Sequence, residues 1–513
     1  MEGNLRAAFL SAEAVPFVKA GGLADVAGAL PGELARLGHE LRLILPYHDA
    51  VARQRLPLTE LGRWPLAAGT GLAAADYRLL ALAPAENPAV LFIDAPAYFA
   101  RPGIYTDAQT GEAYADDGER WLFFSLASLD ALARLGAPVD LLHGNDHHCG
   151  LAPALLERHY RRHAALARTA TLHSIHNLAY QGIHPRELLA KTGLDATAGG
   201  PWDFHGRLNF MQAGIRTADL LSTVSPRYAQ EICSGPEYGY GLTADLAVRR
   251  HELAGILNGI DTALWSPRED AFIAVRYGSE DAAAGKAANK KALLAECGLS
   301  GGPATPLFGI ISRLVDQKGC DLVAGIMARL MSLPLQLVIL GTGQKEWEDI
   351  FCNWAGRHPE RVALFLTFDE GLAHRIEAGA DFFLMPSRYE PCGLNQMYSL
   401  RYGTLPVVRA TGGLADTVVD AGRDAENGNG IVFEPYEAES LLDAIRRALV
   451  LYEDKNRFAR VRRRAMGADF SWARSARAYS ALYQAAACKR RGQADEARRL
   501  LAQLAQGTGV LGA

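Results

Sequence analysis

The chain has 513 residues, which is too long for a single hydrophobic core, and its length alone predicts roughly two to four domains. Hydrophobic residues make up 49% of it and charged residues 21%, as is typical of globular proteins. The net charge of −4, from 53 basic and 57 acidic residues, gives no general attraction for nucleic acid or for an anionic membrane surface.

The seven cysteines show no C-x-x-C spacing, which argues against a disulfide framework or a zinc ribbon and favours a reducing cytoplasm. The N-terminal residues lack a basic start followed by a long apolar core, as a signal peptide would have. No window reaches the roughly 18 apolar residues of a membrane span. We therefore expect a cytoplasmic protein with no membrane partner.

Short apolar runs alternate along the chain with longer amphipathic runs that have the period of a helix. Buried strands that alternate with helices predict an α/β protein with parallel sheets. One series of strands is expected at residues 5–11, 40–46, 89–94, 139–144, 170–176 and 219–225, and a second series at residues 306–312, 335–341, 362–368, 381–387, 404–410 and 429–434.

The two series of strands are separated near residues 259–305, which end in a cluster of Gly and Pro. We expect two doubly wound, Rossmann-like domains joined by a hinge. Ligands of such sheets bind at the carboxyl ends of the strands, so the two ends should face each other across a cleft. The predicted parts are residues 1–260, residues 261–465, a helix at 466–488 and a loosely packed tail at 489–513.

The loop after the first expected strand contains Lys19, Gly21 and Gly22, followed by an apparent helix. Paired glycines let the backbone approach a ligand, a helix start offers free N–H groups to an anion, and a lysine adds a point charge. The same residues also fit an ordinary glycine turn with a solvated lysine. This loop alone leaves both interpretations open.

Two further loops of the first domain carry polar side chains at strand ends. The segment H-G-N-D-H-H-C places Asp146 among histidines and next to Cys149, and a later loop carries His173, His176 and Asn177. Histidine and cysteine are metal ligands, but adjacent residues cannot all point at one ion. We therefore favour polar groups that line a cleft, with a metal-dependent hydrolase as the alternative.

In the second domain, Arg313 and Lys318 lie five residues apart in the loop after the first strand. Both could reach a diphosphate, or they could be solvated cations beside neighbouring aspartates. A later turn, E-P-C-G, places Glu390 between a strand and a helix start. The stretch T-G-G-L-A-D that follows repeats the G-G-L-A-D of the first loop, so both domains are expected to share one strand–glycine–helix arrangement.

Seven motifs occur in one order between residues 19 and 418. They are K-x-G-G-L-A-D-V, H-x-x-D, H-N-L-A-Y-Q-G, L-N-G-I-D-x-x-x-W-S-P, S-R-L-x-x-Q-K-G, P-S-R-Y-E-P-C-G-L-x-Q and T-G-G-L-A-D-T-V. In this combination the sequence resembles bacterial glycogen synthase and plant starch synthase, over roughly residues 5–485.

The resemblance implies the GT-B fold, in which two Rossmann-like domains face each other across a cleft. It also implies transfer of glucose from ADP-glucose to the non-reducing end of an α-1,4-glucan such as glycogen, with retention of configuration and with no metal or cofactor. The N-terminal domain would bind the acceptor and the C-terminal domain the donor.

The resemblance also assigns roles to residues of this sequence. Arg313 and Lys318 would neutralise the diphosphate, and Glu390 would lie beside the transferred glucose. The residues implied in catalysis are Glu390, Asp146, His176, Lys318 and Arg313. The residues implied in ADP-glucose binding are Lys19, Gly21, Gly22, Arg313, Lys318, Glu390, Gly393, Leu394 and Asn395.

Four positions depart from the family pattern. Ala20 stands where Thr is usual, His147 where Trp is usual and Asn395 where Thr is usual. Phe368 stands where Tyr is common, which keeps an aromatic face for adenine but removes the phenol.

The sequence also bears on the mechanism. A retaining glycosidase uses two carboxylates roughly 5 Å apart, and the strand-end motifs hold no such pair. We therefore expect Glu390 to hold a sugar hydroxyl and to offset positive charge, while the acceptor hydroxyl attacks on the face from which ADP leaves. The alternatives are UDP-glucose as the donor and a non-catalytic glucan-binding homologue. No nucleic acid partner is expected, and an oligomer is compatible with the sequence.

Overall fold

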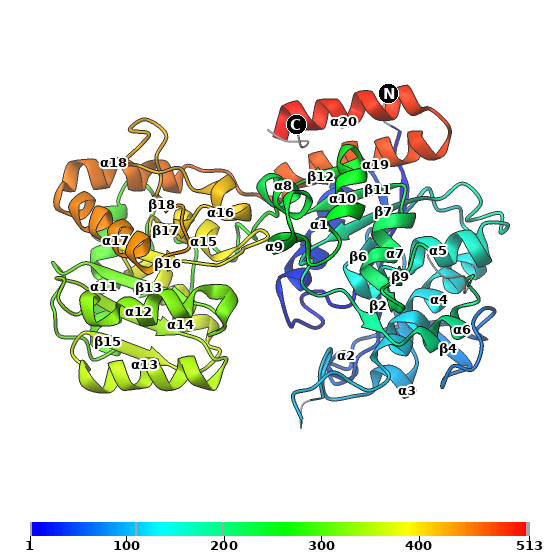
Figure 1. The fold of residues 1–513 in the computed structure, drawn as a ribbon, viewed down its shortest axis with the longest axis horizontal. Coiled ribbons are helices and arrows are strands. Elements are labelled where there is room, and N and C mark those ends of the chain that lie inside the picture. The colour runs from blue at the N-terminus through cyan, green and yellow to red at the C-terminus, as the bar shows by residue number, and fades with distance from the viewer. Residues whose placement is uncertain (1–2, 108–109, 196–199, 509–513) are drawn as a thin grey trace. The chain divides into compact units, whose positions relative to one another are not determined.

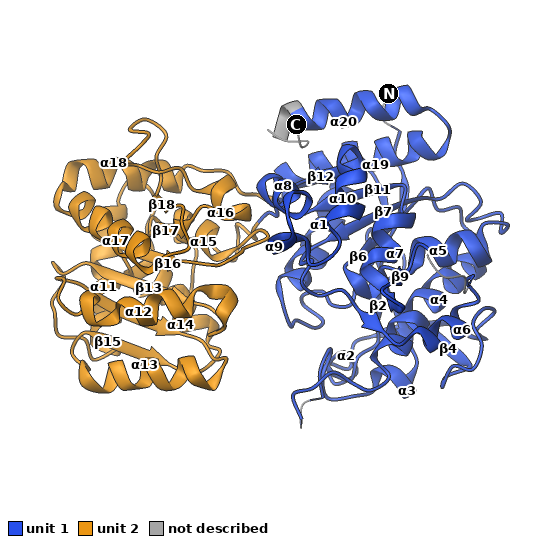
Figure 2. Cartoon of the chain, viewed as in Figure 1, with its two compact units in different colours: residues 1–259, 472–513 blue, residues 260–471 orange. Residues whose placement is uncertain are grey.

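The computed structural model of the chain describes residues 3–107, 110–195 and 200–508. The chain folds into two compact units, one made of residues 1–259 and 472–513 and the other of residues 260–471 (Figure 2). Each unit contains a largely parallel sheet with helices between its strands (Figure 1). Within the described ranges, no helix is long and apolar enough to span a membrane.

The first unit is built on a nine-stranded sheet with the order β12-β11-β7-β6-β1-β2-β5-β4-β3. Its strands pair in parallel, except that β4 is antiparallel to both β3 and β5. The strands are β1 (Arg6–Leu10), β2 (Glu40–Pro46), β3 (Leu58–Pro65), β4 (Asp76–Leu82), β5 (Ala89–Asp94), β6 (Leu141–Asn145), β7 (Ala170–Ile175), β11 (Leu220–Thr223) and β12 (Leu253–Gly255).

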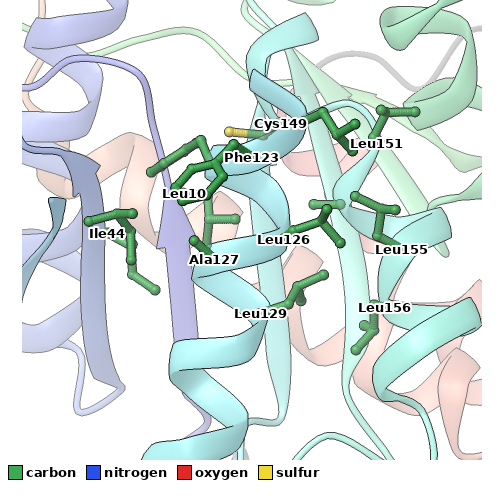
Figure 3. Close-up of a cluster of buried hydrophobic side chains, with 14 of the residues drawn as sticks. Leu10, Ile44, Phe123, Leu126, Ala127, Leu129, Cys149, Leu151, Leu155 and Leu156 are labelled. Carbon is green, nitrogen blue, oxygen red and sulfur yellow. The ribbon is translucent and has the colours of Figure 1, made fainter. Parts of the chain in front are cut away.

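Side chains of β1 alternate between two hydrophobic cores, because successive residues of a strand point to opposite faces. Ala8 and Leu10 pack in the cluster that contains helix α4 (Asp117–Leu135), whereas Ala7 and Phe9 pack in the cluster that contains α1 (Gly22–Arg36). Figure 3 shows part of the first cluster, with Leu10, Ile44, Phe123, Leu126, Ala127 and Leu129 among its labelled side chains. Both faces of the sheet are therefore covered, as in a doubly wound fold.

Side-chain caps start two of the remaining helices of this unit, since Asn209 accepts from the Gln212 N–H and Ser225 from the Tyr228 N–H. A small sheet has the order β8-β10-β9, with β8 at Ile183–His184, β9 at Asp203–Phe204 and β10 at Arg207–Asn209. The helices are α2 (Asp49–Ala52), α3 (Pro96–Phe99), α5 (Ala152–Leu155), α6 (Leu189–Thr192), α7 (Phe210–Thr217), α8 (Pro226–Ser234), α9 (Pro236–Gly239) and α10 (Thr243–Val248).

Two helices at the end of the chain belong to the first unit. In α19 (Trp472–Arg490), the Tyr483 hydroxyl lies 2.8 Å from Nδ1 of the buried His143. We expected a loosely packed tail after residue 488, but α20 (Ala494–Thr508) buries Leu500, Leu501 and Leu504 in the cluster that contains α1 and α19. Residues 509–513, the end of that predicted tail, lie outside the described residues.

The second unit is built on a six-stranded, fully parallel sheet with the order β15-β14-β13-β16-β17-β18. Numbered along this unit, the order is 3-2-1-4-5-6, the arrangement of a Rossmann fold. The strands are β13 (Leu307–Ile311), β14 (Gln336–Leu340), β15 (Val362–Phe365), β16 (Phe382–Met385), β17 (Leu405–Arg409) and β18 (Ile431–Phe433). The helices are α11 (Ala282–Glu296), α12 (Cys320–Leu330), α13 (Lys345–Arg357), α14 (Glu370–Gly379), α15 (Asn395–Tyr402), α16 (Gly412–Thr417), α17 (Ala438–Glu453) and α18 (Lys455–Met466).

Candidate active site

The predicted site residues of the second unit lie where the strand order of its sheet reverses. β14 lies on one side of β13 and β16 on the other, so the loops that follow β13 and β16 diverge at this point. Ligands of doubly wound sheets bind at such a switch point. The loop after β13 carries Arg313 and Lys318, and the loop after β16 carries Glu390.

Lys318 and Glu390 form an ion pair at this switch point. The Lys318 Nζ donates to Glu390 Oε2 at 2.7 Å, and the Ser387 hydroxyl donates to the same oxygen at 2.9 Å. The Glu390 side chain is only 7% exposed and that of Lys318 is 19% exposed. The structure therefore brings these two predicted residues together, with one ammonium and one carboxylate held at the edge of the sheet.

Glycines shape the turn that carries Glu390. Gly412 has a φ of +42°, and a Cβ there would lie 1.9 Å from the Glu390 carbonyl oxygen, whereas a Cβ on Gly413 would lie 2.0 Å from the Cys392 oxygen. The G-G pair at the start of α16 therefore lets this helix start touch the Glu390 turn, and the Gly413 N–H donates to the Glu390 carbonyl oxygen at 3.1 Å. Cys392 is buried in this tight turn.

The other predicted residues of the second unit differ in their surroundings. Arg313 is exposed and forms no ion pair with any residue in the described part of the chain. Helix α15 begins after Leu394, which is its N-cap, and Gly393 just before it has a φ of +73°. The Asn395 amide donates to the Ile311 oxygen at 2.6 Å, so its side chain ties α15 to the end of β13.

An aromatic side chain stands exposed at the start of α14. Phe368 is 87% exposed, and the next residue, Asp369, caps the helix by accepting from the Leu372 N–H at 2.8 Å. An exposed phenyl ring contributes nothing to a core, so its position is compatible with stacking on a ligand.

In the first unit, the strand order reverses between β1 and β6, which are followed by the Lys19 loop and the Asp146 loop. Lys19 is exposed and its Nζ donates to Asp25 at 2.7 Å. The N–H groups of Ala20 and Gly21 donate to the buried carboxylate of Glu13. Two of the N–H groups that the glycine loop was expected to offer to an anion are therefore already bound within the protein.

Asp146 lies at the end of β6, and its carboxylate holds the loop that carries His176. Asp146 Oδ1 accepts from the His176 N–H at 2.7 Å and from the Asn177 N–H at 3.3 Å. Burial raises the pKa of Asp146 to about 7, with a smaller contribution from the negative charge of Glu13. The backbone of Asp146 has a φ of +53°, which is uncommon outside glycine.

The His176 ring is neutral in this environment, because burial lowers its pKa to about 4. Its Nε2 lies 2.9 Å from the Asn145 Oδ1, which can only accept, so Nε2 carries the hydrogen. The Asn145 amide in turn donates to the Leu10 oxygen at 2.8 Å. Asn145 therefore links His176 to the end of β1, and the structure brings Asp146 and His176 together.

The remaining side chains of H-G-N-D-H-H-C point in different directions. His143 faces Tyr483 of α19, and the His148 ring stacks on Tyr105 with 4.8 Å between ring centroids. Cys149 is fully buried among apolar side chains (Figure 3). In the described residues, no group of three or more His, Cys, Asp or Glu side chains is arranged to hold a metal ion.

Comparisons with known proteins place the chain in a family. The model of the starch synthase catalytic domain matches residues 6–248, and that of glycosyl transferases group 1 matches residues 303–464. A glycogen synthase of Myxococcus xanthus is 46% identical over 489 residues, which cover 93% of this chain and 98% of that relative. The chain belongs to the glycogen synthase and starch synthase family.

Two further members of the family span nearly the whole chain. A glycogen synthase of Dechloromonas aromatica is 45% identical over 503 residues and covers 95% of this chain and 99% of that relative. The catalytic domain of starch synthase IV from Arabidopsis thaliana, solved with ADP and acarbose, is 32% identical with a TM-score of 0.85, and covers 94% of this chain and 100% of that one. The chain is thus a glycosyltransferase with the GT-B fold.

Two site residues of this family member were not predicted from its sequence. Glu13 follows an apolar strand, and a lone acid in S-A-E-A-V is a weak signal, although a carboxylate next to a buried run needs a partner. Tyr105 donates to Glu13 Oε1 at 2.9 Å across 92 residues of sequence, and nothing local in the sequence indicates that pairing.

Proposed function

We propose that this glycosyltransferase transfers glucose from ADP-glucose to the non-reducing end of an α-1,4-glucan, with retention of anomeric configuration. The observation that carries the proposal is the Lys318–Glu390 ion pair at the switch point of the second sheet. The solved relative with a TM-score of 0.85 was bound to ADP and acarbose, which supports an adenine nucleotide and an oligosaccharide as ligands here. We expect the reaction to take place in the cytoplasm, as the cysteine spacing predicts.

Departure of ADP requires cations that stabilise the growing negative charge on its phosphate. Lys318 supplies a point charge to the diphosphate, and the exposed Arg313 supplies a guanidinium that can bind two oxygens at once. The start of α15 adds backbone N–H groups. Removing one such group typically costs about 3–4 kcal/mol of transition-state stabilisation. In the first unit, Lys19 is proposed as a further cation for the diphosphate.

The glucosyl group develops positive charge as the bond to ADP breaks. Glu390 is the acid proposed to hold a sugar hydroxyl and to offset that charge, and Lys318 keeps its carboxylate oriented. The acceptor hydroxyl attacks on the face from which ADP leaves, and its proton passes to the departing phosphate oxygen. Asp146 and the neutral His176 are proposed to hydrogen-bond the glucose or the acceptor.

The donor is tested by comparing initial rates with ADP-glucose and UDP-glucose on a maltooligosaccharide acceptor. We expect kcat/KM to be roughly 10-fold or more higher with ADP-glucose than with UDP-glucose. A factor of ten corresponds to about 1.4 kcal/mol. A preference for UDP-glucose overturns the donor assignment and leaves the reaction class intact. Absence of transfer from either donor supports the non-catalytic glucan-binding alternative.

The mechanism is tested separately by searching for a covalent glucosyl–enzyme adduct by mass spectrometry of the intact protein during turnover. A same-face reaction predicts that no adduct accumulates with the natural donor or with a slow fluorinated donor. An adduct mapped to any side chain contradicts it.

A further inference from the structure

Glu13 is buried directly behind the loop that carries Lys19. Its side chain is almost completely inaccessible, and its two carboxylate oxygens accept three hydrogen bonds. Oε2 accepts from the N–H groups of Ala20 and Gly21, and Oε1 accepts from the Tyr105 hydroxyl at 2.9 Å. A single carboxylate therefore fixes the backbone immediately after Lys19 and immediately before α1.

The same carboxylate also connects this loop to the Asp146 loop. The Tyr105 ring, which donates to Glu13, stacks on His148 with an interplanar angle of 25°, and His148 is two residues after Asp146. The His148 ring in turn meets Trp121 of α4 edge-on at 4.6 Å. Glu13 thus connects the Lys19 loop to the Asp146 loop at the switch point of the first sheet, through the Tyr105 hydroxyl and the stacking of the Tyr105 ring on His148.

We propose that Glu13 is a positioning residue of the glycosyl-transfer reaction, which sets the conformation of the Lys19–Gly22 loop without contacting the donor. This inference rests on the proposed role of Lys19 in binding the donor diphosphate. All three donors point at carboxylate oxygens, so nothing in this arrangement requires Glu13 to give up or take a proton. Its task is to hold the backbone at Ala20 and Gly21, whose N–H groups both donate to its carboxylate.

The chemistry of the three hydrogen bonds distinguishes positioning from acid–base catalysis. A Gln side chain can accept both backbone N–H groups through its amide oxygen and can donate its NH₂ to the Tyr105 oxygen. Glu13→Gln therefore keeps the loop in place, whereas Glu13→Leu leaves the Ala20 and Gly21 N–H groups without a partner. We expect Glu13→Gln to retain kcat/KM for the donor within about 5-fold and Glu13→Leu to lose roughly 100-fold, the scale of a small misplacement of reacting groups.

A double-mutant cycle with Lys19 tests whether Glu13 acts through the loop. If it does, Glu13→Leu loses most of its effect in a Lys19→Ala background, and the coupling is visible as non-additivity. Tyr105→Phe keeps the ring on His148, removes only the hydroxyl, and is expected to lower kcat/KM by about 5-fold, the scale of one hydrogen bond. This variant keeps the test decisive if Glu13→Leu fails to fold.

Glu119 provides a matched control, because Glu119 Oε1 accepts from the Ala73 N–H at 2.6 Å and from the Tyr98 hydroxyl at 2.5 Å. Glu119→Leu breaks a carboxylate–tyrosine–backbone contact away from the Lys19 loop, so we expect it to lower thermal stability but not kcat/KM.

The outcomes separate this inference from the proposed function. Full activity of Lys19→Ala alone overturns the role of Lys19 and, with it, the inference. Suppose instead that Lys19→Ala greatly lowers kcat/KM, but the effects of Glu13→Leu and Lys19→Ala are additive in the double variant. This result overturns the positioning role of Glu13 and leaves the proposed function intact. Loss of activity in Glu13→Gln equal to that in Glu13→Leu also overturns it, since a catalytic carboxylate would then be required.

Discussion

The ammonium of Lys318 and the carboxylate of Glu390 lie 2.7 Å apart, and neither has much solvent around it. Removing the partner of a mostly buried charge destabilises the fold, because an unpaired charge is then left in the interior. In the absence of substrate, Lys318 and Glu390 therefore neutralise each other. When a donor phosphate arrives, the ammonium can face both the phosphate and Glu390. The pair is thus suited to hold a cation close to the leaving group and an anion close to the sugar.

Replacing Lys318 by Ala should lower kcat by roughly 100- to 1000-fold, because a preorganised charge at the leaving group is removed. Initial rates with ADP-glucose at saturating acceptor measure the loss. Lys345→Ala is the matched control, since Lys345 is an exposed lysine of α13 in the same unit that pairs with Asp349. A Lys318→Ala rate within a few-fold of the parent contradicts the assignment.

Phe368 should contribute to donor binding through its exposed ring. We expect Phe368→Ala to raise the KM for ADP-glucose by about 10-fold, since stacking of a base on an aromatic side chain contributes about 1–3 kcal/mol. Phe368→Tyr should keep the parent KM. The ring is 87% exposed, so neither change should alter the midpoint of thermal unfolding, and an unchanged KM in Phe368→Ala would exclude stacking.

At the scale of elements, the two G-G-L-A-D segments differ although their sequences match. In the second unit, the two glycines that begin α16 touch the backbone of Glu390 and Cys392, where a Cβ would lie within 2.0 Å. In the first unit, Gly21 has extended backbone, and a Cβ there would lie 3.6 Å from a Glu13 carboxylate oxygen. The shared pattern therefore serves close loop packing in the second unit, whereas Gly21 of the first unit has room for a methyl group.

This difference predicts opposite results for the same substitution. Gly412→Ala, at the position that matches Gly21, should push the Glu390 turn away from α16, lower both activity and the unfolding midpoint, and cost at least the roughly 1–3 kcal/mol typical of overpacking. Gly21→Ala should leave the unfolding midpoint unchanged, because it adds a methyl group in ordinary van der Waals contact. Differential scanning calorimetry of both variants checks the contrast, and equal destabilisation would refute it.

Strand positions were predictable from the sequence where apolar runs are continuous. The runs at residues 40–46 and 89–94 are confirmed as β2 and β5, because both faces of those strands are buried and the signal is strong. The β3–β4 pair was not predicted, since β3 alternates with exposed polar residues at the sheet edge. The Glu13–Tyr105 contact could not be predicted, because it depends on how distant loops meet.

At the scale of the whole molecule, several histidines of the first unit are neutral because they are buried. Burial lowers the pKa of His48 to about 4 and that of His173 to about 3, and lowers the pKa of His143 and His148 well below the usual range. In the unfolded chain these groups take up protons near pH 6.5. Below that pH the unfolded state binds more protons, so the free energy of unfolding falls as pH falls.

We therefore expect the free energy of unfolding of the first unit to fall between pH 7 and pH 5, by up to about 1.4 kcal/mol per pH unit for each histidine. Its unfolding midpoint should fall with it. Glu13 and Asp146, whose pKa values are raised by burial, act in the opposite direction but are fewer. Calorimetry across this range measures the slope. His173→Phe should reduce it, and a midpoint that rises on acidification would contradict the prediction.

The proposed reaction adds glucose from ADP-glucose to the non-reducing end of an α-1,4-glucan with retained configuration. Proton NMR of the products formed from ADP-glucose and a short maltooligosaccharide tests it most directly, since linkage and anomeric configuration are read in one spectrum. We predict a lengthened chain with a new α-1,4 linkage and stoichiometric release of ADP. A β-linked product, or no lengthening with this donor, would contradict the claim.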